Sequence, residues 1–278
     1  MAIIVVGAGV TGLTVAHRLQ EKGADVIVLE KEPVVGGLCR SYRYGDFIFD
    51  IGPHRLSSGN KEVNNFFLSM LNGEFNSIPR HSSVYMYNKY LSWPLSLAGV
   101  FSLPLKKTFN CALDLLNLNH VQEADLKDLE EYITARYGPT IFKLFWEKYT
   151  EKFLGIKCRE VDADWARLSV RHAIIDRKAV PNGLFDLAKN CLIRKGSELN
   201  FMYPKGGMGT FPEMMAAGVK KRGGAILTSQ NISSVTVKPD STVRVRSGNR
   251  EIDGTSLVWT GSLIDLCRIT GQPNPGLD

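Results

Sequence analysis

Three glycines near the amino end, Gly7, Gly9 and Gly12, follow a short apolar run that predicts a buried strand. The first glycine permits a tight turn and the second lets the backbone approach a pyrophosphate. The third lets the next helix pack close to the strand. The N–H groups at the start of that helix, at Val10 and Thr11, favour bound phosphate. The spacing therefore predicts a loop that holds the phosphates of a dinucleotide.

An acidic residue, Glu30, lies at the position where a dinucleotide site has its ribose-binding carboxylate. Glu30 ends the next apolar run and follows Gly12 by 18 residues, near the ~20 expected for an acid that accepts hydrogen bonds from ribose hydroxyls. Lys31 comes directly after it. Three glycines alone are a weak signal, but here they lie between a predicted strand and a predicted helix. This context favours dinucleotide binding over a chance match.

A second glycine pair, Gly36 and Gly37, follows, and Leu38 is next to it. Alone, the pair would indicate an ordinary loop. Together, residues 7–37 resemble the glutathione-reductase-like flavoproteins, in the branch of amine oxidases, protoporphyrinogen oxidases and UDP-galactopyranose mutases. The resemblance implies FAD as the cofactor, with the acidic residue and the glycine pair near its adenosine and pyrophosphate.

The same resemblance assigns residues near the flavin ring. Gly52, Pro53 and His54 end a segment that runs beside the ring in that branch, and the rigid Gly-Pro pair would place His54 over it. Arg171 matches a substrate-site arginine of the mutases, where a guanidinium can hold a diphosphate with two hydrogen bonds. His54 and Arg171 are thus the catalytic candidates. The alternatives are a structural histidine and a surface arginine on a helix.

Three later segments resemble the same branch. They are residues 148–155, residues 203–209 and residues 224–232. Ile232 falls at a position that contacts adenine in the relatives. Thr260 and Gly261, at the end of the last predicted strand, complete the implied FAD-binding set.

Elements that would position these residues follow from hydrophobic periodicity and turn signals. Residues 84–91 predict a hairpin, and Asp125 is a candidate helix cap. One helix is predicted to follow the glycine turn and to end at Gly23, and further helices are predicted at residues 61–71, 125–137, 140–153, 162–173 and 211–222. Strands are predicted at residues 2–6, 25–29, 225–227, 235–238, 242–246 and 257–260.

This order predicts an α/β fold, a Rossmann-type FAD-binding domain with an inserted, largely helical substrate domain. The first part of the FAD-binding domain is residues 1–80, and the insertion is residues 81–200. The chain returns to the FAD-binding domain in residues 201–278. Family members continue further, to a segment that closes over the flavin. We therefore expect that closing segment to be missing.

Composition narrows the function classes. Five cysteines stand singly, so neither a zinc site nor a disulfide framework is predicted, and a reducing cytoplasm is favoured. The net charge of +6 suits FAD and a small-molecule substrate, an anionic one included, but no basic run interleaved with aromatics indicates nucleic acid. Residues 91–105 are apolar but shorter than the ~20 of a membrane span. They predict a core or pocket wall, with shallow membrane contact as the alternative. No pattern predicts an oligomeric state.

Three functions remain open. The first is an FAD-dependent oxidoreductase of the amine oxidase or protoporphyrinogen oxidase type, which moves a hydride from substrate to flavin N5. The second is a flavin-dependent isomerase of a nucleotide sugar, like UDP-galactopyranose mutase. The third is an FAD-binding fragment without turnover of its own.

Overall fold

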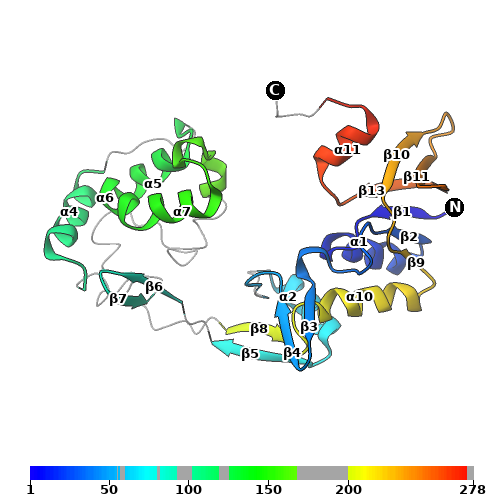
Figure 1. Ribbon diagram of the computed structural model, residues 1–278, viewed down its shortest axis with the longest axis horizontal. Coiled ribbons are helices and arrows are strands. Elements are labelled where there is room, and N and C mark those ends of the chain that lie inside the picture. Colours follow the sequence, from blue (N-terminus) through cyan, green and yellow to red (C-terminus); the bar gives the residue numbers. More distant parts are fainter. Residues whose placement is uncertain are drawn as a thin grey trace. The chain divides into compact units, whose positions relative to one another are not determined.

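The structure is a computed structural model that describes most of the chain (Figure 1). The described residues are 1–54, 56, 60–79, 82–92, 102–118, 125–167 and 200–273. Internal contacts divide the chain into two compact units. One joins residues 1–79 to residues 200–278, and the other comprises residues 80–199.

A four-stranded parallel sheet forms the centre of the first unit, in the order β13, β1, β2, β9. Ile3 of β1 lies opposite Val26 of β2 on one side and Ser256 of β13 on the other. The strands are β1 (Ile3–Val6), β2 (Val26–Leu29), β9 (Ala225–Leu227) and β13 (Ser256–Trp259). All four strands were predicted to within one residue at each end, and the α/β fold with a parallel sheet is confirmed.

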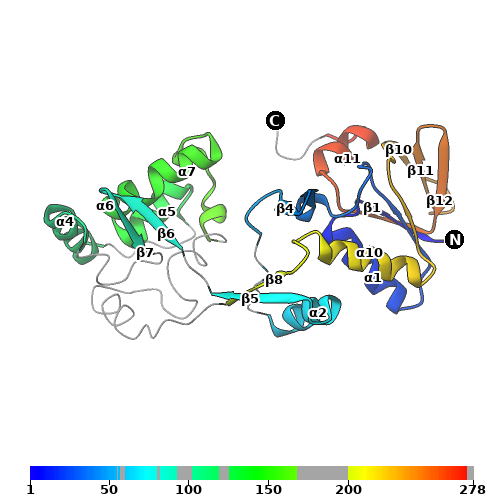
Figure 2. The same ribbon diagram turned by 60° about the horizontal axis from the view of Figure 1, so that its bottom comes forward.

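Helices cover one face of this sheet. Helix α1 (Val10–Glu21) and helix α10 (Thr210–Lys221) lie side by side in Figures 1 and 2, and α2 (Lys61–Leu71) packs against α10. Val5 and Val28 of the sheet are fully buried in this layer. A fully buried valine of this kind stabilises the fold by about 1.5–3 kcal/mol.

A three-stranded antiparallel sheet covers the other face. Its strands are β10 (Ile232–Val237), β11 (Val243–Ser247) and β12 (Arg250–Gly254). Val243 and Val245 alternate along β11 and pack against Ile4 of β1, as expected for a strand with one buried face. Helix α11 (Leu263–Thr270) follows β13 and contacts β10.

Two further strand pairs complete the first unit, and their pairing was not predicted. Strands β3 (Ser41–Tyr44) and β4 (Phe47–Asp50) form a hairpin, and β5 (Phe75–Pro79) pairs antiparallel with β8 (Asn200–Pro204). The chain therefore leaves the first unit and re-enters it on neighbouring strands. A 3-10 turn, η1 (Gly37–Cys39), precedes β3.

The second unit contains a hairpin and several helices. The hairpin of β6 (Ser83–Met86) and β7 (Lys89–Ser92) confirms the prediction for residues 84–91. The helical elements are α4 (Leu105–Leu116), α5 (Leu129–Tyr137), α6 (Pro139–Ile141), the π-helical turn η3 (Phe142–Trp146), α7 (Glu147–Leu154) and the 3-10 turn η4 (Cys158–Glu160).

Two helix predictions in this unit need correction. The cap of α5 is Asp128, whose Oδ1 accepts from the Glu131 N–H at 2.9 Å, so the prediction of Asp125 was wrong. The helix predicted at residues 140–153 is interrupted by the π-helical turn η3. Of the helix predicted at residues 162–173, residues 163–167 are helical and residues 168–173 lie outside the described residues.

Candidate functional site

The carboxyl ends of the parallel strands bring three predicted segments to one edge of the sheet. Gly7 follows β1, Glu30 follows β2 and Thr260 follows β13. The Gly7 N–H donates to the Leu29 carbonyl at 2.8 Å, and the Thr260 N–H donates to the Val6 carbonyl at 2.9 Å. Ligands of open parallel sheets bind at this edge.

Gly7 and Gly12 leave no room for side chains. A Cβ on Gly12 would lie 1.9 Å from the carbonyl oxygen of Gly7. Gly7 has a φ of +100°, and a Cβ there would lie 2.6 Å from Thr260 Oγ1. Helix α1 can thus begin directly against the turn that ends β1, as the sequence predicted from this spacing.

The amino end of α1 has the properties of an anion site. Gly9 is its N-cap, no side chain caps it, and its first turn holds no acidic residue. The N–H groups of Val10, Thr11 and Gly12 lie in the first turn, where a helix has no internal acceptors for them. These donors and the positive end of the helix dipole suit a phosphate group.

The second glycine pair lies against the first glycine loop. Gly36 donates its N–H to the Ala8 carbonyl at 2.8 Å, and Gly9 and Gly36 are bridged as in a parallel sheet. A Cβ on Gly37 would lie 3.2 Å from the Cα of Gly9. The two segments, distant in sequence, therefore form a surface of bare backbone that a side chain would fill.

Glu30 turns its carboxylate into the glycine loop. The residue is 6% exposed. Its Oε2 accepts from the Ala8 N–H at 2.6 Å and its Oε1 accepts from the Glu32 N–H at 2.9 Å. Each carboxylate oxygen has a second lone pair for a further donor such as a ribose hydroxyl. Lys31, the next residue, is exposed.

A segment after β9 runs beside Glu30. The Glu30 N–H donates to the Leu227 carbonyl at 2.9 Å, and the Gln230 N–H donates to the Glu30 carbonyl at 2.8 Å. Ile232, the predicted adenine contact, lies two residues further along and begins β10. It packs in the apolar layer between the two sheets. Gly261, next to Thr260 at the end of β13, is exposed.

His54 and Leu38 meet near the glycine pair. His54 Nε2 lies 2.8 Å from the Leu38 carbonyl oxygen, so this nitrogen must carry the proton and donate. The His54 N–H donates to the Gly52 carbonyl at 2.8 Å, which closes a tight turn around Pro53. The Leu38 side chain is 76% exposed. The residue after the glycine pair is thus hydrogen-bonded to the segment that is predicted to lie beside the flavin ring.

Asp50 is an organising residue that the sequence did not reveal. Its Oδ1 accepts from Ser41 Oγ at 2.5 Å and from the Met208 N–H at 3.1 Å, and its Oδ2 accepts from the Tyr203 hydroxyl at 2.7 Å. Burial and the Asp50 carboxylate raise the pKa of Tyr203 to about 12, so its hydroxyl stays a donor. Asp50 thereby fixes residues 203–209 against the hairpin that leads to His54.

Burial and the nearby Asp50 charge also raise the pKa of the Cys39 thiol. Cys39 therefore stays a thiol at neutral pH, where a thiol behaves as a small apolar side chain. Within the described ranges, no group of three His, Cys, Asp or Glu side chains is arranged to hold a metal ion.

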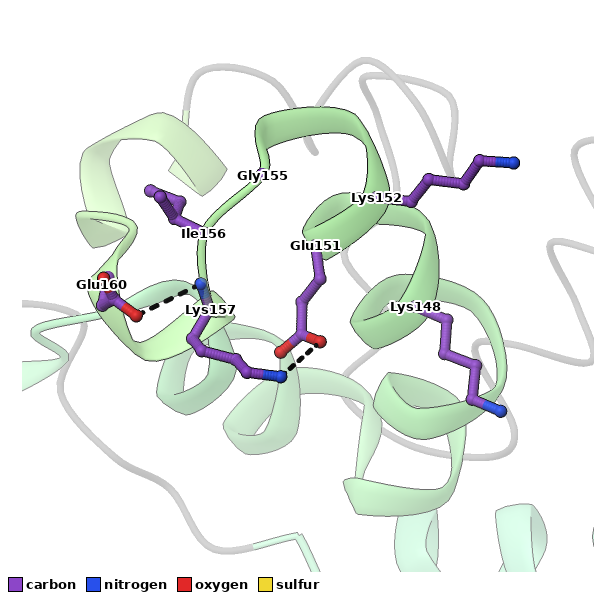
Figure 3. Close-up of a pocket in the computed structure, with 7 residues that line it drawn as sticks. All are labelled: Lys148, Glu151, Lys152, Gly155, Ile156, Lys157 and Glu160. Atoms are coloured by element: carbon purple, nitrogen blue, oxygen red, sulfur yellow. Dashed lines mark hydrogen bonds and ion pairs between the residues drawn. The ribbon is translucent and has the colours of Figure 1, made fainter.

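The second unit offers a separate hollow. Residues 148–155, one of the family-like segments, form most of α7 and end at Gly155, whose φ is +75°. A pocket of about 480 Å³ is lined by Lys148, Glu151, Lys152, Gly155, Ile156, Lys157 and Glu160 (Figure 3). Lys157 Nζ and Glu151 Oε2 pair at 3.0 Å, while Lys148 and Lys152 extend away from that pair. Arg171 lies outside the described residues.

Comparison with known proteins agrees with this arrangement. The sequence model of the family described as "flavin containing amine oxidoreductase" matches residues 10–273. The chloroplastic prolycopene isomerase of Daucus carota is 27% identical over 88% of this chain and 43% of its own length. The chain thus spans less than half of that relative.

Two solved structures share the fold. A reduced UDP-galactopyranose mutase superposes with a TM-score of 0.78 at 21% identity, over 99% of this chain and 58% of the mutase. The cyclohexylamine oxidase of Brevibacterium oxydans IH-35A gives a TM-score of 0.64 at 18% identity, over 98% of this chain and 61% of the oxidase. The family match covers nearly the whole chain, which therefore belongs to the flavin-containing amine oxidoreductases.

Proposed function

We propose that this chain binds FAD along the carboxyl edge of its parallel sheet and oxidises a small molecule at the flavin. One observation carries the proposal. The glycine turn, the glycine pair and the buried Glu30 carboxylate meet at that edge, and each leaves backbone or lone pairs available to a ligand. A flavin cofactor is also what the family description implies.

The chain's own groups divide the work of holding FAD. The N–H groups of Val10, Thr11 and Gly12 bind the pyrophosphate at the amino end of α1. Glu30 accepts hydrogen bonds from the adenosine ribose through its remaining lone pairs. Ile232 provides an apolar contact for adenine.

At the other end, the turn of Gly52 and Pro53 sets the position of His54 beside the flavin ring. When bound, FAD supplies the two-electron acceptor that the oxidation requires. In the tautomer that donates from Nε2 to the Leu38 carbonyl, His54 Nδ1 is the ring atom that can accept a hydrogen bond from substrate. Thr260 and Gly261 border the site from the end of β13.

Arg171 remains the proposed substrate-binding residue. A guanidinium suits a carboxylate or phosphate on the substrate, and the net charge of +6 fits an anionic one. Replacement by lysine would keep the charge but lose the two-pronged geometry. A raised KM with little change in kcat is the expected result for an anionic substrate.

The first experiment is a visible absorption spectrum of the chain after incubation with FAD and gel filtration. Flavin bands that travel with the protein support the proposed cofactor. Anaerobic bleaching of those bands by an amine, a porphyrinogen or another reduced compound supports oxidation. Protein that stays colourless at saturating FAD would refute the cofactor assignment.

A second candidate is an isomerase that uses the bound flavin without net oxidation. It is favoured by the prolycopene isomerase relative, which aligns over 88% of this chain. The two candidates differ in one readout. An isomerase would convert its substrate with no net consumption of an electron acceptor, and its flavin would have the same redox state before and after turnover, whereas an oxidase would consume one acceptor per product.

The chain's limited span of its relatives motivates the third candidate, a fragment that binds FAD and needs a further polypeptide for turnover. Retained flavin with no reduction by any substrate class would favour this candidate. Reduction by a single class would remove it.

A further inference from the structure

One face of the β3–β4 hairpin (Figure 1) consists of exposed aromatic side chains. Side chains alternate between the two faces of a strand, and every second position of both strands is aromatic. The register sets these positions directly opposite each other in two pairs, so all four side chains share one face. This aromatic face comprises Tyr42, Tyr44, Phe47 and Phe49, with exposed fractions of 54%, 79%, 68% and 56%.

The opposite face of the hairpin is fixed to the loop that precedes α10. Ser41 Oγ accepts from the Gly209 N–H at 2.7 Å, and Arg43 Nη2 donates to the Gly206 carbonyl at 3.3 Å. A slip of one residue would turn the aromatic side chains toward this loop, but the hydrogen bonds would be lost. The register of the hairpin therefore keeps the aromatic face in solvent.

The composition of the aromatic face fits a contact between identical subunits. None of its four side chains carries a charge, since Arg43 points to the opposite face and Asp46 lies in the turn. The cores of protein interfaces are enriched in tyrosine and phenylalanine and depleted in charged residues, and homodimer interfaces are the more apolar ones. An uncharged face can also meet its own copy without repulsion between like charges.

The area of the aromatic face is close to that of a dimer contact. A buried aromatic side chain covers about 150–250 Å², so the exposed parts of these four amount to about 400–650 Å². Two copies would bury about 800–1,300 Å² through these side chains alone, and a specific interface typically buries about 1,200–2,000 Å² in total. This area predicts a reversible dimer rather than a permanent one.

We propose that two copies of this chain associate through the aromatic face of the β3–β4 hairpin. The two faces pack against each other as in stacked sheets. A two-fold axis along the strands lays the tyrosine row of each copy over the phenylalanine row of the other. Because the same patch serves both copies, the assembly closes at two.

A lipid surface fits the aromatic face less well. Asp46 at the tip of the hairpin would have to enter the bilayer with the aromatic side chains, where a carboxylate is costly. Among the described residues, no helix is long and apolar enough to cross a membrane. The membrane contact considered for residues 91–105 stays a prediction, because residues 93–101 lie outside the described part of the chain.

Sedimentation velocity of the whole chain tests the proposal. Over a range of about 1–100 µM, the dimer fraction should rise with concentration, and no larger species should form. Because the aromatic face carries no charge, raising the salt concentration from about 0.05 to 0.5 M should not weaken the dimer.

Tyr44→Thr with Phe47→Thr removes one opposite pair and keeps residues that favour strands. Each substitution acts twice in a symmetric dimer, so the dissociation constant should rise by at least about 100-fold. The matched control is Tyr85→Thr with Tyr90→Thr, an opposite pair on the β6–β7 hairpin with exposed fractions of 61% and 77%. That control should leave the dissociation constant within about threefold.

A second variant separates loss of the aromatic face from damage to the hairpin. Tyr44→Phe with Phe47→Tyr exchanges the two side chains, keeps the aromatic area and should keep the dimer. Circular dichroism should be unchanged in all three variants, because every substituted side chain is exposed.

Three outcomes would overturn the proposal. The first is a wild-type chain that stays monomeric at about 100 µM, including one that binds lipid vesicles or another polypeptide instead. The second is a Tyr44→Thr, Phe47→Thr variant that dimerises as tightly as the wild type or no more weakly than the β6–β7 control. The third is a dimer that salt dissociates, since charged groups elsewhere would then form the contact.

Discussion

Glu30 combines two tasks in one carboxylate. It holds the glycine loop through the Ala8 and Glu32 N–H groups, and in the proposed site it also binds ribose. In Glu30→Gln, the side-chain NH₂ group would face either the Ala8 or the Glu32 N–H group, and two donors cannot form a hydrogen bond with each other. Hydrogen bonds to charged groups are worth about 1.5–3 kcal/mol. We therefore expect FAD affinity to fall by about 10- to 100-fold in a flavin fluorescence titration.

Glu32→Gln is the matched control for that variant. Glu32 is 42% exposed, and its pair with Arg40 spans 3.5 Å, so the pair is worth at most about 1 kcal/mol. Its loss should weaken FAD binding by less than about fivefold. Equal effects of the two substitutions would contradict the role assigned to Glu30.

His17 predicts a pH-dependent stability. Its side chain is 2% exposed on α1, against Phe66 of α2. Burial lowers its pKa below 6.5; Arg222 and Arg18 lower it further, while Glu21 opposes them. Well above pH 6.5, the His17 side chain is neutral in both the folded and the unfolded chain. As pH falls through 6.5 the unfolded chain binds the proton first, so stability declines.

We expect the free energy of unfolding to fall between about pH 7 and pH 5, by at most about 1.4 kcal/mol per pH unit for this one proton. His17→Leu should remove that slope. Urea unfolding at a series of pH values measures it. Glu21 has a lowered pKa and stays ionised across this range. An identical slope in the variant would show that other groups cause it.

Two glycines at opposite ends of α1 give a matched test of the element that carries the site. Gly12→Ala would place its Cβ 1.9 Å from a backbone oxygen, whereas the Cβ of Gly23→Ala would meet nothing within 4 Å. Gly23 has a φ of +80°, so its substitution costs about 1–2 kcal/mol.

Gly12→Ala must move α1 away from β1, and we expect a larger loss of stability together with a loss of FAD binding. Gly23→Ala should keep FAD affinity within about twofold, since its cost is local backbone strain. Thermal unfolding and flavin titration of both variants provide the comparison. Unchanged FAD affinity in Gly12→Ala would show that the glycine turn is not required for cofactor binding.

Elements with strong local signals were predictable. Helix α2 begins and ends at the predicted residues, and the β6–β7 hairpin has its turn at Tyr87 and Asn88. The cap of α5 was misplaced because two aspartates precede the helix. Asp128 with Glu131 three residues later has the capping-box spacing, and that spacing could have decided between them.

Long-range features were harder to predict. The β3–β4 hairpin was not predicted, although it has a local signal, a Gly45-Asp46 turn between alternating aromatic residues. No local sequence signal indicates the role of Asp50, because its partners Tyr203 and Met208 lie more than 150 residues away in the sequence. Pairing of β5 with β8 likewise has no local signal, because about 120 residues of the second unit separate the two strands in the sequence.

At the scale of the whole molecule, the division into two units predicts an uneven response to cofactor. All the proposed FAD contacts that the structure describes lie in the unit of residues 1–79 and 200–278. A ligand stabilises the state that it binds, by about 2.7 kcal/mol at 100 times its Kd. Amides that exchange by opening of that unit should therefore slow when FAD is added.

Hydrogen exchange with mass spectrometry can resolve this response by segment. Protection should increase in residues 3–13, 26–38 and 256–261, while α5 and α7 of the other unit exchange at an unchanged rate. Trp259 fluorescence offers an independent optical check, because Trp259 is the one tryptophan of the sequence in the FAD-binding unit. Equal slowing in both units would mean that the chain opens as one cooperative body. Slowing confined to α5 and α7 would place the cofactor elsewhere and refute the proposed site.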